Sequence, residues 1–165
     1  MSDNKFVIEE ATISDIDSLI MLRSELLDNS DGIYGCKNEL DQKKWKFAYK
    51  SWLEKKIEHD GRVAILIAKD SLSGNAVGCI TGVIDSRAPT IDCINGFSGW
   101  VQSMVVKKEM RNKGIAISLL EVLLKWFNEA EVKKISLQST VVAESLYNKF
   151  GFQQYNEKSY YLIYD

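Results

Sequence analysis

The sequence is poor in the residues that build extended, disulfide-linked or metal-bound proteins. It has one proline, three cysteines and one histidine among 165 residues. A single proline excludes collagen-like and proline-rich extended chains. Cys36, Cys79 and Cys93 form no C-x-x-C pair, and an odd number of cysteines with one histidine fits neither a zinc site nor a secreted disulfide framework. We therefore expect reduced, structural thiols and no bound metal.

Long apolar runs and an excess of positive charge are missing too. The longest uninterrupted apolar run covers residues 63–68, whereas a membrane helix needs roughly 20 such residues. The first ten residues lack the apolar core of a signal peptide. We therefore expect a cytoplasmic protein without a membrane partner. The 21 basic and 23 acidic side chains leave a net charge of −2, so no global positive field attracts nucleic acid.

The remaining composition is typical of one globular domain. Hydrophobic residues make up 45% of the chain, charged residues 27% and aromatic residues 10%. We find no repeat, low-complexity tract or long linker, so residues 1–165 are interpreted as a single domain. A chain of this length buries a core without disulfides or metals.

Hydrophobic periodicity predicts strands and helices in a mixed order. Thr12 and Ser14, each followed three residues later by Asp, are capping-box candidates for the first helix. Gly151 is a candidate left-handed residue after the last helix. The predicted elements are a strand over 5–10, a helix from about 16 to 27, a helix ending near 60–61, two hairpin strands over 62–69 and 76–85, a strand over 99–106, a helix over 115–127, a strand over 134–139, a helix over 142–150 and a closing strand over 158–164.

The most informative segment, residues 104–116, is predicted to be a strand, a tight basic turn and a helix. Gly114 at the helix start lets the backbone approach a ligand closely, and the unpaired N–H groups of the first turn favour an anion such as a pyrophosphate. Arg111 and Lys113 add positive charge. A basic turn exposed to solvent is the simpler interpretation of this stretch taken alone.

Two motifs resemble those of one enzyme superfamily. The run from Arg111 to Ala116 has the pattern R-x-x-G-x-A, which resembles the Q/R-x-x-G-x-G/A signature of the GNAT superfamily of acetyl-CoA-dependent N-acetyltransferases. About thirty residues later, Ala143 to Phe152 is similar to the A-x-x-L-Y-x-x-x-G-F segment of that superfamily. The resemblance is strongest over residues 99–152.

The resemblance implies an α/β fold: a mixed, mostly antiparallel sheet with helices on both faces. It also implies that the fourth and fifth strands start side by side and splay apart, leaving an opening for acetyl-CoA, used as a cosubstrate without a metal. The strand backbone would pair with the pantetheine arm and the turn would hold the pyrophosphate. The cofactor-binding residues expected are Met104, Val105, Val106, Arg111, Asn112, Lys113, Gly114, Ile115, Ala116 and Ser139.

Tyr147 matches the general acid of the superfamily. A neutral amine is already a nucleophile and a thioester is already activated, so catalysis mostly requires alignment, oxyanion stabilisation and protonation of the leaving thiolate. A backbone N–H near Met104 or Val105 would serve the oxyanion, and the Tyr147 phenol would supply the proton. The alternative for Tyr147 is a core tyrosine with a hydrated hydroxyl.

The chain departs from the superfamily pattern at two places. Thr140 stands where many members carry Asn, and residues 99–106 contain no Asp or Glu to act as general base. Amine deprotonation would then use a water chain or a carboxylate elsewhere. His59 is the only histidine, but its place beside Asp60 and Gly61 fits an ordinary helix C-terminus better than a catalytic base.

The acceptor is expected to be a small cationic amine. Residues 1–31 carry eight acidic side chains against Lys5 and Arg23, and this region would border the acceptor entrance. Glu25, Asp28 and Tyr34 are the substrate-binding candidates. A solvated acidic helix face is the alternative.

Other functions remain open at this stage. They are a protein N-acetyltransferase, a non-catalytic acyl-CoA-binding or regulatory domain and, resting only on the lysine-rich turn and second helix, a phosphate-binding or nucleic-acid-binding module. The protein is expected to be a monomer or homodimer. Residues 158–164 are apolar on both faces, which permits a partner strand or burial under a helix.

Overall fold

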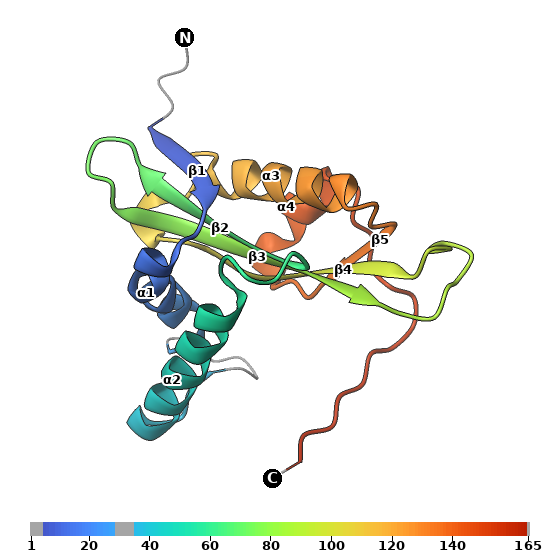
Figure 1. The fold of residues 1–165 in the computed structure, drawn as a ribbon, viewed down its shortest axis with the longest axis horizontal. Helices are drawn as coiled ribbons and strands as arrows, with labels where there is room; N and C mark the ends of the chain where they lie inside the picture. The colour runs from blue at the N-terminus through green and yellow to red at the C-terminus, as the bar shows by residue number, and fades with distance from the viewer. Residues whose placement is uncertain (1–4, 29–34, 165) are drawn as a thin grey trace.

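The computed structural model describes residues 5–28 and 35–164, which form one five-stranded sheet flanked by helices (Figure 1). The strands are β1 (Phe6–Glu10), β2 (Val63–Asp70), β3 (Ala76–Ser86), β4 (Phe97–Val106) and β5 (Lys134–Leu137), in the spatial order β1-β2-β3-β4-β5. The first four strands are antiparallel neighbours, and β5 pairs parallel to β4. The predicted mixed, mostly antiparallel sheet is therefore confirmed.

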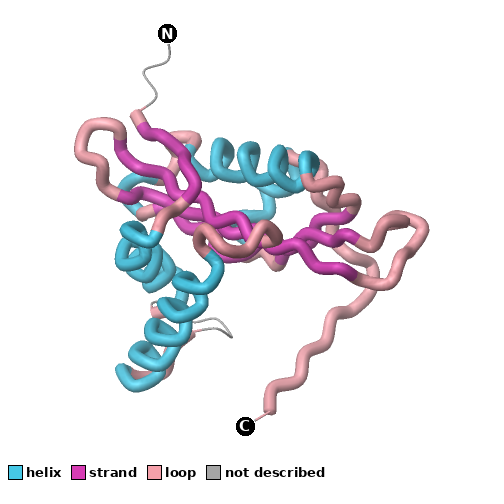
Figure 2. Tube along the Cα trace, in the orientation of Figure 1, coloured by secondary structure: helices cyan, strands magenta, loops and turns pink. Residues whose placement is uncertain are grey.

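Helices cover both faces of the sheet, as predicted. The long helices are α1 (Ile16–Leu27), α2 (Glu39–Lys56) and α3 (Ile115–Glu129), and the short α4 is Glu144–Lys149. Helices α1 and α2 pack on one face, around a core that includes Leu19 and Leu53. Helices α3 and α4 pack on the other, around Leu119 and Phe127 (Figure 2).

Local sequence explains where α1 and α2 begin. The Thr12 amide and hydroxyl both donate to Oδ2 of Asp15, at 2.9 and 3.0 Å, so the predicted Thr12 capping box forms ahead of the 3₁₀ turn Ile13–Asp15. Oδ1 of Asn38 accepts a hydrogen bond from the Asp41 amide at 2.9 Å and caps α2. Both caps satisfy amides that the first helical turn leaves unpaired.

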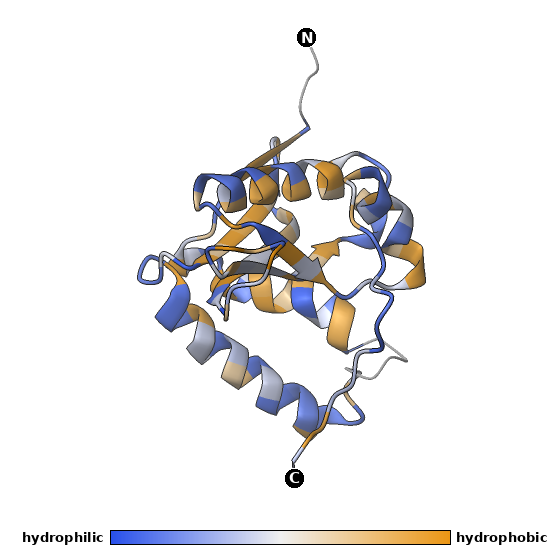
Figure 3. Ribbon diagram, turned by 90° about the vertical axis from the view of Figure 1, so that its right-hand side faces the viewer, coloured by the Kyte–Doolittle hydropathy of each residue, from blue (hydrophilic) through white to orange (hydrophobic). Residues whose placement is uncertain are grey.

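Helix α3 lies close to the sheet because two strand residues have no side chain. A Cβ added at Gly82 would lie 2.6 Å from Cδ1 of Leu123, and one at Gly99 would lie 2.7 Å from Cε1 of Phe127. Leu119, Leu120, Leu123 and Phe127 of this helix are fully buried. The hydrophobic colour in Figure 3 concentrates on the strands and on the sides of the helices that face them. The glycines therefore set the helix-to-sheet spacing on the α3 face.

The predicted closing strand over residues 158–164 was wrong. After bends at Asn156 and Glu157 the chain forms no ladder, and residues 153–164 are exposed (Figure 1). The isoleucine and tyrosines there favour a strand, but a strand also needs a partner edge, which this segment does not contact in the structure. The predicted strand over 134–139 also ends earlier, at Leu137.

Within residues 5–28 and 35–164, no helix combines the length and apolar composition required to cross a bilayer.

Candidate active site

The parallel pair of strands, β4 and β5, stays together over only part of the length of β4. Pairing between β4 and β5 covers only Ser98–Val101 with Lys134–Leu137, while β4 continues to Val106. Met104, Val105 and Val106 therefore lie on the part of β4 that has no β5 neighbour. Their backbone groups on that side are free of the parallel ladder, which leaves an opening of the kind expected for an extended ligand.

A bulge interrupts β4 at the start of this opening. Cys79 pairs with Val105 and Thr81 with Gln102, so two residues of β4, Ser103 and Met104, stand opposite one residue of β3. Ser103 has a φ of 55°, a left-handed conformation rare for a residue with a side chain. A bulge turns backbone groups out of the ladder, so it re-aims amides next to the site. No local sequence pattern indicates this bulge, because a bulge depends on the register of two strands.

The basic turn after β4 has the geometry of an anion site. Asn112 and Gly114 both have positive φ, 60° and 83°, and Gly114 caps the N-terminus of α3. Nε of Arg111 donates to the Val106 carbonyl at 3.2 Å, which ties the turn to the end of β4. A Cβ added at Gly114 would meet no atom within 4 Å, so the space in front of the helix is open. First-turn amides and the helix dipole face this space.

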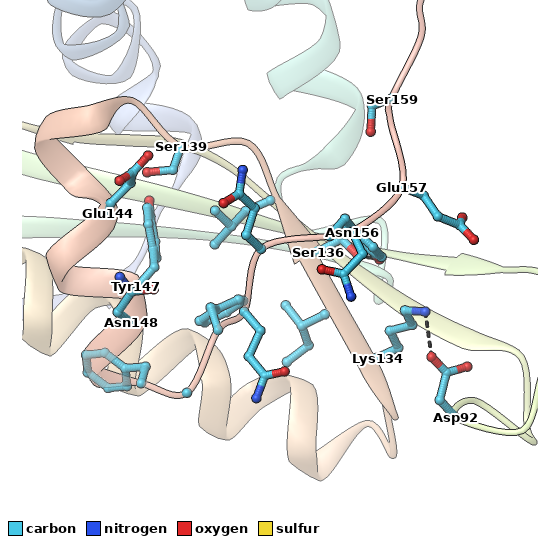
Figure 4. Close-up of a pocket in the computed structure, with 18 of the residues that line it drawn as sticks. Asp92, Lys134, Ser136, Ser139, Glu144, Tyr147, Asn148, Asn156, Glu157 and Ser159 are labelled. Carbon is cyan, nitrogen blue, oxygen red and sulfur yellow. Dashed lines mark hydrogen bonds and ion pairs between the residues drawn. The ribbon is translucent and has the colours of Figure 1, made fainter.

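Tyr147 on α4 lies in the same core cluster as the start of α3. It is 7% exposed, packs edge-to-face on Phe152 at 5.7 Å between ring centres, and shares its cluster with Ile115. Met104 and Val106 pack against that cluster. Burial raises the pKa of Tyr147, so the phenol holds its proton at neutral pH. In Figure 4 the hydroxyl lies at the end of the ring nearest Ser139 and Glu144.

A large hollow borders Tyr147. Its volume is about 1240 Å³, and it runs between β5, α4 and residues 152–160. Ser139, Glu144 and Tyr147 line one end, and the ion pair of Lys134 with Asp92, 2.6 Å, lies at the other (Figure 4). Oγ of Ser139 donates to the Thr140 carbonyl at 2.8 Å. The structure thus brings Ser139 and Tyr147, both predicted from the sequence, to the wall of one hollow.

The three residues predicted to bind the acceptor are Glu25, Asp28 and Tyr34, and their surroundings differ from one another. Oδ1 of Asp28 accepts a hydrogen bond of 3.0 Å from Nε1 of Trp45. Oδ2 of Asp28 forms an ion pair of 2.9 Å with Nζ of Lys46. Burial disfavours the charged carboxylate, but the bonds from Lys46 and Trp45 outweigh it, and the pKa of Asp28 lies below its ordinary value. Glu25 is half-buried on α1. Tyr34 lies outside the described residues.

A buried polar cluster that the sequence reading missed lies on the α1 and α2 side of β3. The Arg23 guanidinium stands 4.3 Å from the Tyr49 ring centre, and neither Nε of Arg23 nor the Tyr49 hydroxyl has a hydrogen-bond partner. Sγ of Cys79 donates to the Ser103 carbonyl at 3.5 Å, and burial raises the pKa of this thiol to about 12. Sequence spacing could not indicate that Arg23 lies over the Tyr49 ring, because the two residues come from different helices.

The other candidates lie away from Tyr147. His59 is exposed in the turn after α2, and its amide donates to the Lys56 carbonyl at 3.4 Å. Strand β4 carries no acidic side chain along its whole length. In the described part of the chain, no three His, Cys, Asp or Glu side chains come together as a metal site.

Comparison with known proteins places this arrangement in a family. The family model described as the acetyltransferase (GNAT) family matches residues 25–152. No curated protein sequence matches the chain.

Solved structures with the same fold cover nearly the whole chain. A predicted acetyltransferase with acetyl-CoA from Clostridium acetobutylicum is 20% identical, with a TM-score of 0.79 over 95% of this chain and 96% of that one. Glucosamine-6-phosphate N-acetyltransferase from Arabidopsis thaliana is 18% identical, with a TM-score of 0.67 over 95% and 97%. An aminoglycoside 6′-N-acetyltransferase from Acinetobacter baumannii is 14% identical, with a TM-score of 0.71 over 97% and 98%. At these identities the likeness establishes the fold.

Proposed function

Because the chain belongs to the GNAT acetyltransferase family, we propose that it transfers the acetyl group of acetyl-CoA directly to a primary amine of a small molecule. The observation that carries this proposal is the continuous path from the β4 bulge to the turn at Gly114, with Tyr147 packed beside it. The path offers backbone amides to an extended, phosphate-bearing thioester and a proton donor near its reactive end.

The turn and the strand position the donor in this proposal. Amides from residues 112–116 hold the pyrophosphate, and Lys113 adds a positive charge. The unpaired end of β4, from Met104 to Val106, pairs with the pantetheine amides. Ser139, which lines the hollow beside Tyr147, is the further residue expected to contact the donor. A backbone N–H beside the bulge, at Met104 or Val105, faces the thioester carbonyl and stabilises the oxyanion.

Tyr147 then protonates the leaving group. The amine nitrogen attacks the carbonyl carbon, and the new C–N bond gives a tetrahedral oxyanion. The C–S bond breaks as the phenol proton passes to sulfur, which yields coenzyme A and the acetamide. The extra proton on nitrogen leaves to water, because β4 carries no carboxylate, and water restores the proton on Tyr147. The raised pKa keeps the donor protonated between turnovers.

We propose a small cationic acceptor that approaches from the α1 and α2 side. The acidic excess of residues 1–31 supports this choice. Internal pairs reduce that excess, since Glu9 and Asp15 both bind Lys69, at 2.6 and 2.8 Å, and Asp28 binds Lys46. Glu25 forms no ion pair with a described residue and is the better candidate to attract the acceptor. We place the reaction in the cytoplasm.

A thiol-release screen tests the proposal. The protein is incubated with acetyl-CoA and, in turn, polyamines, aminoglycosides, amino acids and peptides, and free coenzyme A is measured. We expect amine-dependent release with at least one small cationic amine, and an acetylated product by mass spectrometry. Binding of coenzyme A without turnover on any amine would instead favour a non-catalytic acyl-CoA-binding domain. Turnover on peptides alone would favour a protein acetyltransferase.

A further inference from the structure

Arg23 is a partly buried cation in the layer formed by α1 and α2. Its guanidinium stands 4.3 Å from the centre of the Tyr49 ring, and its Nε is buried without a hydrogen-bond partner. It forms no ion pair with any residue that the structure describes. Removing a charge from water is costly unless an opposite charge pairs with it. The fold therefore keeps an uncompensated positive charge at this place.

The ionisable groups that face the guanidinium from the neighbouring elements are neutral. Tyr49 of α2 and Cys79 of β3 both interact electrostatically with Arg23. Burial raises the pKa of the Cys79 thiol to about 12 and raises the pKa of the Tyr49 phenol above its ordinary value, so both groups keep their protons at neutral pH. Strand β4, which α1 also contacts, carries no charged side chain.

The acidic side chains of α1 do not neutralise Arg23 either. The acids at the two ends of this helix have other partners: Asp28 pairs with Lys46 at 2.9 Å, and Asp15 pairs with Lys69 at 2.8 Å. Glu25 is two positions from Arg23, a spacing at which helix side chains do not face each other. Asp17 is exposed, six positions before Arg23. The positive charge of Arg23 therefore acts on its surroundings without a matching negative one.

This charge lies next to the β4 bulge. The Cys79 thiol, which interacts with Arg23, donates to the Ser103 carbonyl at 3.5 Å. Ser103 is the bulge residue with a φ of 55°, and Met104 and Val105 follow it. The proposed function places the thioester carbonyl beside these two residues and brings the acceptor in from the α1 and α2 side. The attacking nitrogen then approaches within the field of Arg23.

A bound amine has to be neutral before it can attack a thioester. A primary aliphatic amine resembles the lysine side chain, whose pKa is about 10.4, so near pH 7 it is mostly an ammonium ion without a free electron pair. Enzymes commonly use a carboxylate or a histidine to take this proton, and β4 carries neither. A nearby positive charge lowers the pKa of an ammonium group, because like charges repel strongly in a medium of low dielectric. The proton then leaves to water.

We propose that the fixed charge of Arg23 takes the place of a general base, by disfavouring the ammonium form of the acceptor once it is bound beside the bulge. This inference rests on the proposed acetyl transfer and adds how the nitrogen becomes neutral. One ammonium proton passes to water before the C–N bond forms. The tetrahedral intermediate carries a positive nitrogen and a negative oxygen, so its net charge equals that of the neutral amine and thioester. Arg23 therefore opposes the ammonium ion far more than it opposes the later step.

Charges of opposite sign at the entrance and beside the bulge act on different steps. Glu25 attracts a cationic acceptor from solution, where the attraction extends over about a Debye length. Arg23 acts over the last few ångströms, where little water screens its charge. In a diamine or polyamine the distant nitrogen stays charged and keeps the attraction, while the reacting nitrogen beside Arg23 becomes neutral.

The pH dependence of kcat tests this role, because kcat reports ionisation in the bound complex. It is measured with saturating acetyl-CoA and the best amine of the thiol-release screen. In wild type, kcat should reach its plateau at a pH below the solution pKa of that amine. Arg23→Met should move the rise to higher pH by about one unit and lower kcat at pH 7 about tenfold, with both enzymes converging on one plateau.

Three variants separate the charge of Arg23 from other effects. Arg23→Lys keeps the charge and should keep the wild-type profile. Tyr49→Phe keeps both the charge and the ring beneath it, so it should also leave the profile in place. Lys125→Met removes an exposed cation from α3, on the other face of the sheet, and controls for net charge.

The outcomes distinguish this inference from the proposed function. If the profile of Arg23→Met matches that of wild type, acetyl transfer stands and the role of Arg23 is overturned. If Arg23→Met loses the same fraction of kcat at every pH, Arg23 serves packing on Tyr49. If wild type acetylates no amine, the proposed function fails and this inference fails with it.

Binding of unreactive analogues gives a second readout that needs no turnover. Calorimetry in the presence of coenzyme A compares an acceptor analogue whose reacting amine is replaced by trimethylammonium with its neutral tert-butyl isostere. Arg23→Met should bind the charged analogue about tenfold more tightly than wild type does, and the neutral isostere equally well. Urea denaturation establishes that the variant is folded, and Arg23→Gln replaces it if it is not. The same change in affinity for both analogues, or none for the charged one, would contradict the proposal.

Discussion

Trp45 donates its indole hydrogen bond to Asp28 at 3.0 Å, and this contact joins the end of α1 to α2. The same carboxylate pairs with Lys46 at 2.9 Å, and its side chain is 12% exposed. Asp28 therefore anchors one helix to the next ahead of the proposed acceptor entrance. Asp28, which the sequence analysis predicted to bind substrate, thus has a structural role in the fold.

We predict that Asp28→Asn lowers the free energy of unfolding by about 1–2 kcal/mol at neutral pH, since it removes a partly buried ion pair but keeps an oxygen for Trp45. The folded pKa is depressed, so the contribution of the charge is present above the unfolded value of about 3.9 and is lost as pH falls below it. Urea denaturation at pH 7 and pH 3 should show the difference between variant and wild type shrinking in acid. Asp17→Asn on α1, an exposed site, is the control.

Gly114 should be required for binding coenzyme A. Gly114→Asp introduces a carboxylate into the open space before α3, and its charge opposes a pyrophosphate, so affinity should fall on the order of tenfold or more. Gly114→Ala carries the backbone strain of φ 83° without the charge and should lose less. Gly74→Ala, at φ 72° and also with nothing within 4 Å of the added Cβ, controls for strain. Unchanged calorimetric affinity in a folded Gly114→Asp protein would remove the turn from the cofactor site.

Tyr147→Phe should lower kcat by roughly 10- to 10⁴-fold, the range for removal of a general acid. The ring and its contact with Phe152 remain, so affinity for acetyl-CoA should change little. Tyr155→Phe removes a phenol hydroxyl at the opposite end of the hollow and should keep near wild-type turnover. If Tyr147→Phe retains full kcat, the tyrosine serves packing alone.

The pH dependence of kcat should also report Tyr147. The active form is the protonated phenol, and burial raises its pKa above the ordinary value of 10.0. Activity due to this group is therefore full below that value and is lost only as pH rises through the higher pKa. A rate profile measured to the alkaline limit of stability should show no fall assigned to Tyr147 below about pH 10. A decline centred near pH 8 that disappears in Tyr147→Phe would contradict this assignment.

Salt should weaken capture of a cationic acceptor if the α1 side attracts it. We expect kcat/KM for the amine to fall with added salt, and Glu25→Gln to reduce that slope. Glu25 is the cleaner site than Asp28, whose charge Lys46 already balances. Glu54→Gln is the control, because it changes the net charge by the same amount as Glu25→Gln but lies on the exposed side of α2. If kcat/KM falls equally with salt in wild type and in Glu25→Gln, the acidic excess does not attract the acceptor and serves only solubility.

Local pattern in the sequence was enough to predict most helices and strands and the turn that precedes α3. Hydrophobic periodicity predicted the helix over 115–127, which the structure shows as α3, because the side of a helix that is apolar follows from residue spacing alone. Gly114 was placed at the start of α3, where the structure gives it positive φ, because only glycine adopts that conformation at low cost. The two motifs that indicated the family lie within short stretches of chain, so no long-range contact was needed to find them.

Tertiary structure alone decided the features that depend on which segments meet. The bulge at Ser103 comes from the register of β3 against β4, and the pairing of Asp28 with Trp45 and Lys46 comes from how α1 and α2 pack. Residues 158–164 show the limit most clearly. Their composition predicts a strand, yet a strand exists only where a second backbone supplies hydrogen bonds. Composition sets the propensity of a segment, and the tertiary structure decides whether a second backbone lies beside it.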